Sequence, residues 1–267
     1  MKIGVQLYTL RNYAKGESGL ESVFSKVREM GYDTVQYSGC PAFPEEIKTE
    51  TLKKIADANG INICLTHVPV EKIFDQTEKT AEEHLKLGCP TVGLGGMPRP
   101  ARTSPDELKK FIEKMNVAAD KLSEYGLGLA YHHHDFEFNK CGDERIFDTL
   151  IREFDSKIFF TVDTYWAKVG GEDPVAWMKK LDGRIRDLHI KDWTDKVNFF
   201  VKVFLRQKQL MCPVGAGKLD FKSIFAEGKR QGVNTALIEL DIAPKPYVAL
   251  QQSTDYLNKL FPDKSLI

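Results

Sequence analysis

The sequence predicts one (β/α)8 barrel, an α/β fold that spans residues 1–267 as a single domain, and two observations lead to this fold class. The first is alternation, because short apolar segments typical of strands are separated by stretches long enough for helices. These strand segments begin near Lys2, Asp33, Ile61, Thr91, Leu127, Lys157, Arg184 and Thr235. The second is length, because 267 residues fit the roughly 250 residues typical of one such barrel.

The stretches between the strand segments carry helical patterns with one apolar face. In the first of them, apolar residues recur at i, i+3, i+4 and i+7, namely Leu20, Val23, Phe24 and Val27. The fourth begins at Ser104-Pro105-Asp106-Glu107, which combines a cap residue, a proline at the first helical position and a glutamate that can complete a capping box. We therefore expect amphipathic helices that bury one face against the sheet.

Period-two alternation separates the strand side chains that face the helices from those that face the barrel interior. In the first strand, Ile3, Val5 and Leu7 would face outward, and Gly4, Gln6 and Tyr8 inward. The same alternation places ionisable side chains inside later strands, namely Asp163, Asp187, His189, Lys191, Glu239 and Asp241. They gather near the carboxyl ends of the strands, where barrels of this class carry their active sites. Because buried charges are costly unless they are paired or bind a metal, this convergence favours a metal site.

Composition and charge limit the possible functions. The apolar content of 42% and the charged content of 28% are ordinary for a globular protein with a sizeable core. Lys+Arg and Asp+Glu both number 38, so there is no positive excess to bind nucleic acid or a membrane surface. The chain begins on a strand-like segment instead of an apolar leader, and its five cysteines form no C-x-x-C pair. We therefore expect a cytoplasmic protein with reduced thiols, no nucleic-acid partner and no membrane partner.

Four segments carry most of the candidate site residues, and their order along the chain is a specific signal. They are Tyr-His-His-His-Asp-Phe-Glu-Phe at 131–138, Thr-Val-Asp-Thr-Tyr-Trp at 161–166, Asp-Leu-His-Ile-Lys-Asp at 187–192 and Ile-Glu-Leu-Asp at 238–241. Together with Gly-Val-Gln-Leu-Tyr at 4–8, they resemble the sugar phosphate isomerase/epimerase family, the xylose-isomerase-like TIM barrels. The resemblance covers essentially the whole chain.

This resemblance implies one divalent metal ion, held by side chains from strands five to eight. The family usually supplies a carboxylate, an aspartate, a His or Gln, and a glutamate, and the last three positions correspond to Asp163, His189 and Glu239. The strand-five position holds His132 instead of a glutamate, and His134 shares its inward parity, so either histidine could reach the metal. Alignment favours His132. Two imidazoles and two carboxylates suit Mn2+, Co2+ or Zn2+ better than Ca2+.

Further residues are candidates for substrate contacts. His67 ends the third strand, where the family often places a substrate-binding histidine, but its outward parity means that it must lie beyond the regular strand. Tyr8 and Trp166 are expected to line the pocket. Glu137 has three interpretations, as a substrate contact, as a residue that orients a histidine, or as a solvated loop residue.

Three segments outside this set carry weaker expectations. The connection at about 194–213 is long, and the helical spacing of Val197, Phe200, Val201 and Phe204 predicts an amphipathic helix that is a lid, a contact in a homo-oligomer or an extra helix on the barrel. His84 is expected to be exposed on a helix. Gly215-Ala216-Gly217 could present backbone N–H groups to a phosphate, although a simple turn is favoured.

The resemblance also implies proton transfer next to the carbonyl of a small-molecule sugar substrate. A metal that binds two substrate oxygens stabilises the anion formed when the adjacent carbon loses its proton. Glu239 is the candidate base, His134 or His132 the partner acid, and Lys191 an aid for an oxyanion or a phosphate. Return of the proton would isomerise or epimerise a ketose, a polyol ketone or a sugar phosphate.

Three alternatives remain open at this point. The segment Tyr131–His134 is also similar to inosose dehydratases of the same superfamily, so a lyase is the second candidate. A non-catalytic sugar-binding barrel is the third, because the strand-five glutamate is missing. A related apurinic endonuclease is disfavoured by the neutral charge balance and by the shortage of further metal ligands.

Overall fold

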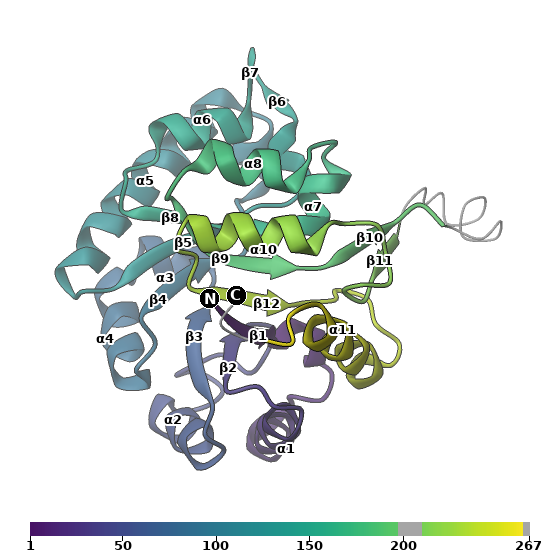
Figure 1. Ribbon diagram of the computed structural model, residues 1–267. Coiled ribbons are helices and arrows are strands. Elements are labelled where there is room, and N and C mark those ends of the chain that lie inside the picture. Colours follow the sequence, from purple (N-terminus) through teal and green to yellow (C-terminus); the bar gives the residue numbers. More distant parts are fainter. Residues whose placement is uncertain (197–209, 264–267) are drawn as a thin grey trace.

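The computed structural model describes residues 1–196 and 210–263. Its main sheet has eight parallel strands in the order β3-β2-β1-β12-β9-β8-β5-β4, with the helices packed around it (Figure 1). The strands are β1 (Lys2–Gln6), β2 (Thr34–Tyr37), β3 (Asn62–Thr66), β4 (Thr91–Leu94), β5 (Gly128–His132), β8 (Ile158–Asp163), β9 (Ile185–Ile190) and β12 (Thr235–Ile238). The predicted (β/α)8 barrel is thereby confirmed.

The helices follow the strands in the expected alternation. They are α1 (Gly16–Glu29), α2 (Thr49–Ala58), α3 (Val70–Phe74), α4 (Thr77–Leu87), α5 (Pro105–Glu124), α6 (Ile146–Glu153), α7 (Thr164–Val169), α8 (Pro174–Leu181), α10 (Phe221–Arg230) and α11 (Pro246–Leu260). All four predicted apolar positions of α1, including Phe24, are buried. At the start of α5 the Ser104 hydroxyl accepts the Glu107 N–H at 3.4 Å, as predicted, whereas the Glu107 carboxylate binds Lys110. Among the helices of the described ranges, none combines the length and apolarity that a membrane span requires.

The two edge strands of the sheet, β3 and β4, meet closely. The Val68 N–H, just beyond β3, donates to the Gly93 carbonyl of β4 at 3.0 Å. A Cβ atom at Gly93 would lie 2.2 Å from the carbonyl oxygen of Thr66, which is backbone and cannot yield cheaply. Glycine is therefore required here, because any side chain would push the edge strands apart.

We expect Gly93→Ala to destabilise the barrel by about 2–3 kcal/mol or more, since overpacking against backbone forces strands to shift. The matched control is Gly128→Ala on the neighbouring strand β5, where an added Cβ meets its nearest atom at 3.6 Å. The measurement is the free energy of unfolding in urea for both variants. Equal stability of the two would show that β3 and β4 do not approach this closely in solution.

The interior of the barrel is layered as the strand alternation predicts. A small apolar cluster of Leu65, Ala130 and Leu237 fills the middle of the barrel. The Asp187 carboxylate pairs with the Thr235 hydroxyl at the amino-terminal side of this cluster, and burial raises the pKa of Asp187 to about 6. Asp187 is thus inward-facing as predicted, but it lies one layer below His189. The other predicted inward charges lie at the carboxyl ends of the strands.

The expectation that His84 is exposed is wrong. Its side chain is buried, with Nε2 2.8 Å from the Thr66 hydroxyl and Nδ1 2.7 Å from the Thr80 carbonyl. The carbonyl only accepts, so Nδ1 carries the hydrogen and Nε2 accepts from Thr66. Burial lowers the pKa of His84 to about 4. His84 therefore joins α4 to the end of β3.

The Gly215–Gly217 segment forms a turn around a carboxylate. The N–H groups of Gly215 and Gly217 donate to Asp192 Oδ2 at 2.9 and 2.8 Å, so they are already satisfied within the chain. Asp192 begins β10 (Asp192–Thr194), which pairs antiparallel with β11 (Leu210–Cys212). The phosphate-binding interpretation of these glycines is wrong, and the favoured turn is confirmed. The predicted amphipathic helix falls at residues 197–209, outside the described residues.

Candidate metal and substrate site

Four side chains at the carboxyl ends of neighbouring strands form a compact cluster. His132 ends β5, Asp163 ends β8, His189 lies near the end of β9 and Glu239 directly follows β12. One ligand atom from each lies within 4.8 Å of all the others, and all four residues are buried. Atoms bonded to one ion at about 2.1 Å stand at most about 4.2 Å apart, so a small inward shift would complete a metal site.

The two imidazoles direct nitrogen lone pairs into this cluster. His132 Nε2 lies 3.3 Å from Asp163 Oδ2 and 3.1 Å from His189 Nδ1, and His189 Nδ1 lies 2.8 Å from Glu239 Oε2. The other nitrogen of His189, Nε2, lies 2.5 Å from Gln36 Oε1. Because an amide oxygen only accepts, Nε2 carries the hydrogen and Nδ1 is left to act as a ligand. Burial lowers the pKa of His132 well below its usual value, and the neutral imidazole is the form that binds metal.

The two carboxylate oxygens of Asp163 have different roles, one in capping a helix and one in the site. As the N-cap of α7 it accepts the N–H groups of Tyr165 and Trp166 on Oδ1, at 3.0 and 2.9 Å. Its Oδ2 faces His132 and is the oxygen available to a metal. The Asp163 N–H donates to His133 Nε2 at 3.0 Å, and His133 Nδ1 donates to the His134 carbonyl. His133 thus faces away from the site, as predicted, and links β5 to β8.

Lys191 is fully buried and holds the carboxylates of the site together. Its ammonium lies 3.0 Å from Asp163 Oδ2, Glu239 Oε2 and Asp241 Oδ1. Burial alone would lower the pKa of Lys191, but the three carboxylates outweigh it and raise that pKa. Burial would likewise raise the pKa of Glu239, yet the Lys191 ammonium holds it well below its usual value. Three carboxylates and one ammonium leave a net charge of −2, which a divalent cation would neutralise. The donor set and the charge therefore both fit a divalent metal.

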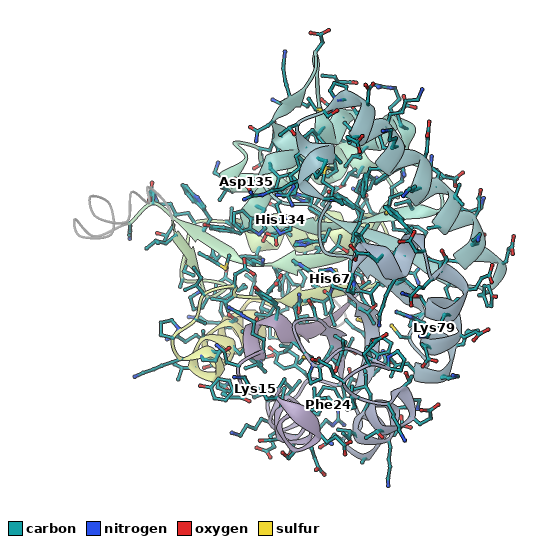
Figure 2. All side chains as sticks on the ribbon, turned by 180° about the vertical axis from the view of Figure 1, so that it is seen from behind. Lys15, Phe24, His67, Lys79, His134 and Asp135 are labelled. Carbon is teal, nitrogen blue, oxygen red and sulfur yellow. The ribbon has the colours of Figure 1, made fainter. Side chains whose placement is uncertain are left out.

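An open cavity of about 820 Å³ lies over the cluster and is lined by His132 and Glu239, by three of the four predicted substrate contacts, Tyr8, His67 and Trp166, and by the candidate acid His134. His67 follows the end of β3 by one residue, as its parity required, and its ring stacks against His132 at 5.4 Å. Figure 2 shows His67 and His134 near the centre of the view, with Lys79 toward its edge. Both imidazoles are therefore placed to meet a ligand.

His134 lines the cavity, whereas Glu137 does not. The His134 ring stacks on Phe136 at 5.4 Å and lies 5.5 Å from the Trp166 ring, with Nδ1 buried and unpartnered among the described residues. Glu137 is fully buried, and its oxygens accept the Tyr131 hydroxyl and, at 2.8 Å, the His134 N–H. Burial raises the pKa of Glu137 to about 7. Because Glu137 is fully buried, it is neither a substrate contact nor a solvated loop residue. Its carboxylate instead holds the backbone of His134 in place.

Sequence reasoning missed several residues of the site. Gln36 fixes the tautomer of His189, and Gln6 Nε2 donates to Glu239 Oε1 at 3.1 Å. Asp241 was placed inside the barrel but given no role, although it binds Lys191 and lines the cavity. Arg102, which also lines the cavity, was not considered. A polar residue at an inward strand position was the available signal for both glutamines.

Comparison with known proteins places these features in a wider group. A family model described as xylose isomerase-like TIM barrel matches residues 24–260. A solved sugar phosphate isomerase/epimerase from Parabacteroides distasonis is 26% identical, with a TM-score of 0.78 over 97% of this chain and 98% of the other. Inosose dehydratase of Geobacillus thermodenitrificans is 25% identical over 84% of each chain. Rhizopine catabolism protein MocC of Rhizobium meliloti is 24% identical over 66% of this chain, a match that spans 58% of its own length.

Proposed function

Because the chain belongs to the xylose isomerase-like TIM barrel family, we propose that it is a metal-dependent isomerase or epimerase that moves a proton next to the carbonyl of a ketose, a polyol ketone or a sugar phosphate. The observation that carries this proposal is the buried cluster of His132, Asp163, His189 and Glu239 beneath a cavity. Its donor set favours Mn2+, Co2+ or Zn2+. When bound, such an ion acts as a Lewis acid that stabilises negative charge on substrate oxygens.

Each residue of the site has a role in proton transfer. Glu239 stays ionised because of Lys191, so one carboxylate oxygen can take the proton from the carbon next to the carbonyl. Gln6 fixes the other oxygen, Oε1, and so orients the base. The Lys191 ammonium lies 3.0 Å from Glu239 but is buried and does not line the cavity, so it acts by keeping the base ionised and in place, not by donating to a substrate oxygen as the sequence suggested. His134 lines the cavity, its Nδ1 has no partner in the described part of the chain, and it is the group proposed to exchange a proton on the far side of the substrate.

The second candidate is a lyase that removes a hydroxyl group from an inosose-like polyol ketone. It is favoured by the inosose dehydratase of Geobacillus thermodenitrificans, which this chain matches over 84% of its length. The same base would start both reactions, and they diverge only in the fate of the anion. Loss of the β-hydroxyl needs a proton donor on that oxygen, a role open to His67 or His134 on the cavity wall.

The test combines metal analysis with turnover in deuterated water. Wild-type protein without a tag should contain about one equivalent of divalent metal, and Glu239→Gln should lose most of the metal and at least about 10²-fold in kcat/KM. Glu144→Gln is the control and should match the wild type, because Glu144 lies in the short antiparallel pair of β6 (Lys140–Cys141) and β7 (Glu144–Arg145) and does not line the cavity. Deuterium uptake with the substrate otherwise intact supports an isomerase or epimerase, and loss of water supports the lyase. Wild-type protein that takes up no metal from Mn2+, Co2+ or Zn2+ would contradict the proposal.

A further inference from the structure

Arg102 lines the same cavity as the metal cluster, and its guanidinium is held rigidly. It ends a short 3₁₀ turn, η2 (Arg99–Arg102), that follows β4. The guanidinium lies 3.7 Å above the centre of the Phe136 ring, and its Nε and Nη2 donate to the Met97 carbonyl at 3.0 and 2.7 Å. These contacts leave Nη1 without a described partner. The side chain is therefore preorganised, so little conformational entropy would be lost when it binds a ligand.

Arg102 forms no direct ion pair with a carboxylate of the described residues. Among the described residues that line the cavity, it is the one lysine or arginine. The acidic lining residues, Glu239 and Asp241, are engaged by Lys191. A positive charge fixed on a cavity wall without a protein partner favours an anion in that cavity.

Two further hydrogen-bonding groups of the same cavity, on His134 and Trp166, are connected to Arg102 through a series of ring contacts. Phe136, which carries the guanidinium on one face, stacks on His134, whose ring neighbours Trp166. The indole Nε1 of Trp166 and the Nδ1 of His134 are both buried without a partner among the described residues. An indole N–H can only donate, and a buried donor left unsatisfied costs about 1–3 kcal/mol, so an acceptor supplied by a ligand would remove that cost.

Space is kept for such a ligand by the loop after β4. Gly96 runs past the His134 ring, where a Cβ atom would lie 3.4 Å from Cε1, and Gly95 runs past His67, where it would lie 3.1 Å from Nδ1. Both glycines line the cavity. At Gly95 and Gly96 the cavity wall therefore carries no side chain, and this part of the cavity stays open.

We propose that Arg102 and the Trp166 indole N–H bind an anionic substituent of the substrate, a phosphate or a carboxylate, while the reacting carbonyl lies over the metal cluster. The substrate is then an acidic sugar derivative. This inference rests on the proposed function for the identity of the substrate as a sugar, but anion binding itself requires no turnover. Arg102 supplies two N–H groups in a fixed plane, which suits the oxygens of either anion.

The test is calorimetric titration of the full chain at constant ionic strength, both metal-free and with Mn2+. The probes are inorganic phosphate, ribulose 5-phosphate, ribulose, and glucuronate for the carboxylate case. We expect ribulose 5-phosphate to bind at least 10-fold more tightly than ribulose, since charged hydrogen bonds contribute about 1.5–3 kcal/mol each. Arg102→Gln should remove this difference, Arg102→Lys should keep part of it, and Trp166→Phe should weaken it.

Arg99→Gln is the matched control, because Arg99 lies in the same turn but is exposed and does not line the cavity. It should bind like the wild type, and an unchanged melting temperature of Arg102→Gln would show that its fold is intact. Tighter binding of glucuronate than of ribulose 5-phosphate would show that the anion bound at Arg102 is a carboxylate. Equal affinity for ribulose and ribulose 5-phosphate, or unaltered phosphate binding by Arg102→Gln, would overturn the inference. If the protein prefers anionic ligands but neither binds metal nor turns over sugars, the inference about anion binding stands and the proposed function is refuted.

Discussion

Replacement of Asp163 by asparagine is expected to remove divalent metal from the cluster and to lower kcat/KM by about 10³-fold, which corresponds to about 4 kcal/mol of transition-state stabilisation. The reason is that its two carboxylate oxygens make different contacts. Oδ2 faces His132 and Lys191, whereas Oδ1 caps α7 through Tyr165 and Trp166. An asparagine can keep its carbonyl oxygen on the cap and place an NH2 group, which cannot bind a metal, toward the cluster.

The matched comparison is Asp163→Ala, which loses the ligand and the cap together. Both variants should fail to hold metal in equilibrium dialysis, but Asp163→Ala should be less stable than Asp163→Asn by about 1 kcal/mol, the usual cost of a lost N-cap. Urea unfolding of the metal-free proteins measures this difference. Stoichiometric metal in Asp163→Asn would show that the ion does not lie at this cluster, and equal stability would show that the cap contributes nothing.

The strands and the inward carboxylates could be predicted because both follow from alternation along a regular element. Once the strand starts were assigned, parity alone placed Asp163, Lys191 and Glu239 inside the barrel, and the structure puts the Lys191 ammonium 3.0 Å from each of the two carboxylates. Gln36 was missed because an inward polar position alone does not show which side chain the residue binds. Its role depends on His189, which is 153 residues away in sequence.

The residues that were misjudged or missed lie outside the regular strands, where the alternation of inward and outward side chains predicts nothing. Arg102 and Glu137 are positioned by short 3₁₀ turns after β4 and β5, and such turns have no long-range periodicity. His84 was misjudged for another reason, since the buried face of α4 is itself partly polar. Thr77, Thr80 and Ala81 share that face with it, so apolar spacing could not reveal it.

Replacement of Lys191 by methionine is expected to destabilise the metal-free protein by about 3–5 kcal/mol, the usual cost of breaking a buried ion pair from one side. The ammonium is fully buried and lies 3.0 Å from the carboxylates of Asp163, Glu239 and Asp241. Methionine has a similar length, so packing is nearly kept and the loss is mainly electrostatic. Without the ammonium, three carboxylates face one another in a buried site.

Added metal should reverse much of this loss, because a divalent ion would neutralise Asp163 and Glu239 and leave Asp241, whose side chain is 23% exposed, to be solvated. Mn2+ should therefore raise the urea midpoint of Lys191→Met more than that of the wild type. Lys218→Met is the control, since Lys218 pairs with Asp195 at the surface and both side chains are nearly half exposed. Its loss should stay below about 1 kcal/mol. A metal-free Lys191→Met as stable as this control would mean that the ammonium does not bind the carboxylates together, and the charge argument for a divalent ion would lose its basis.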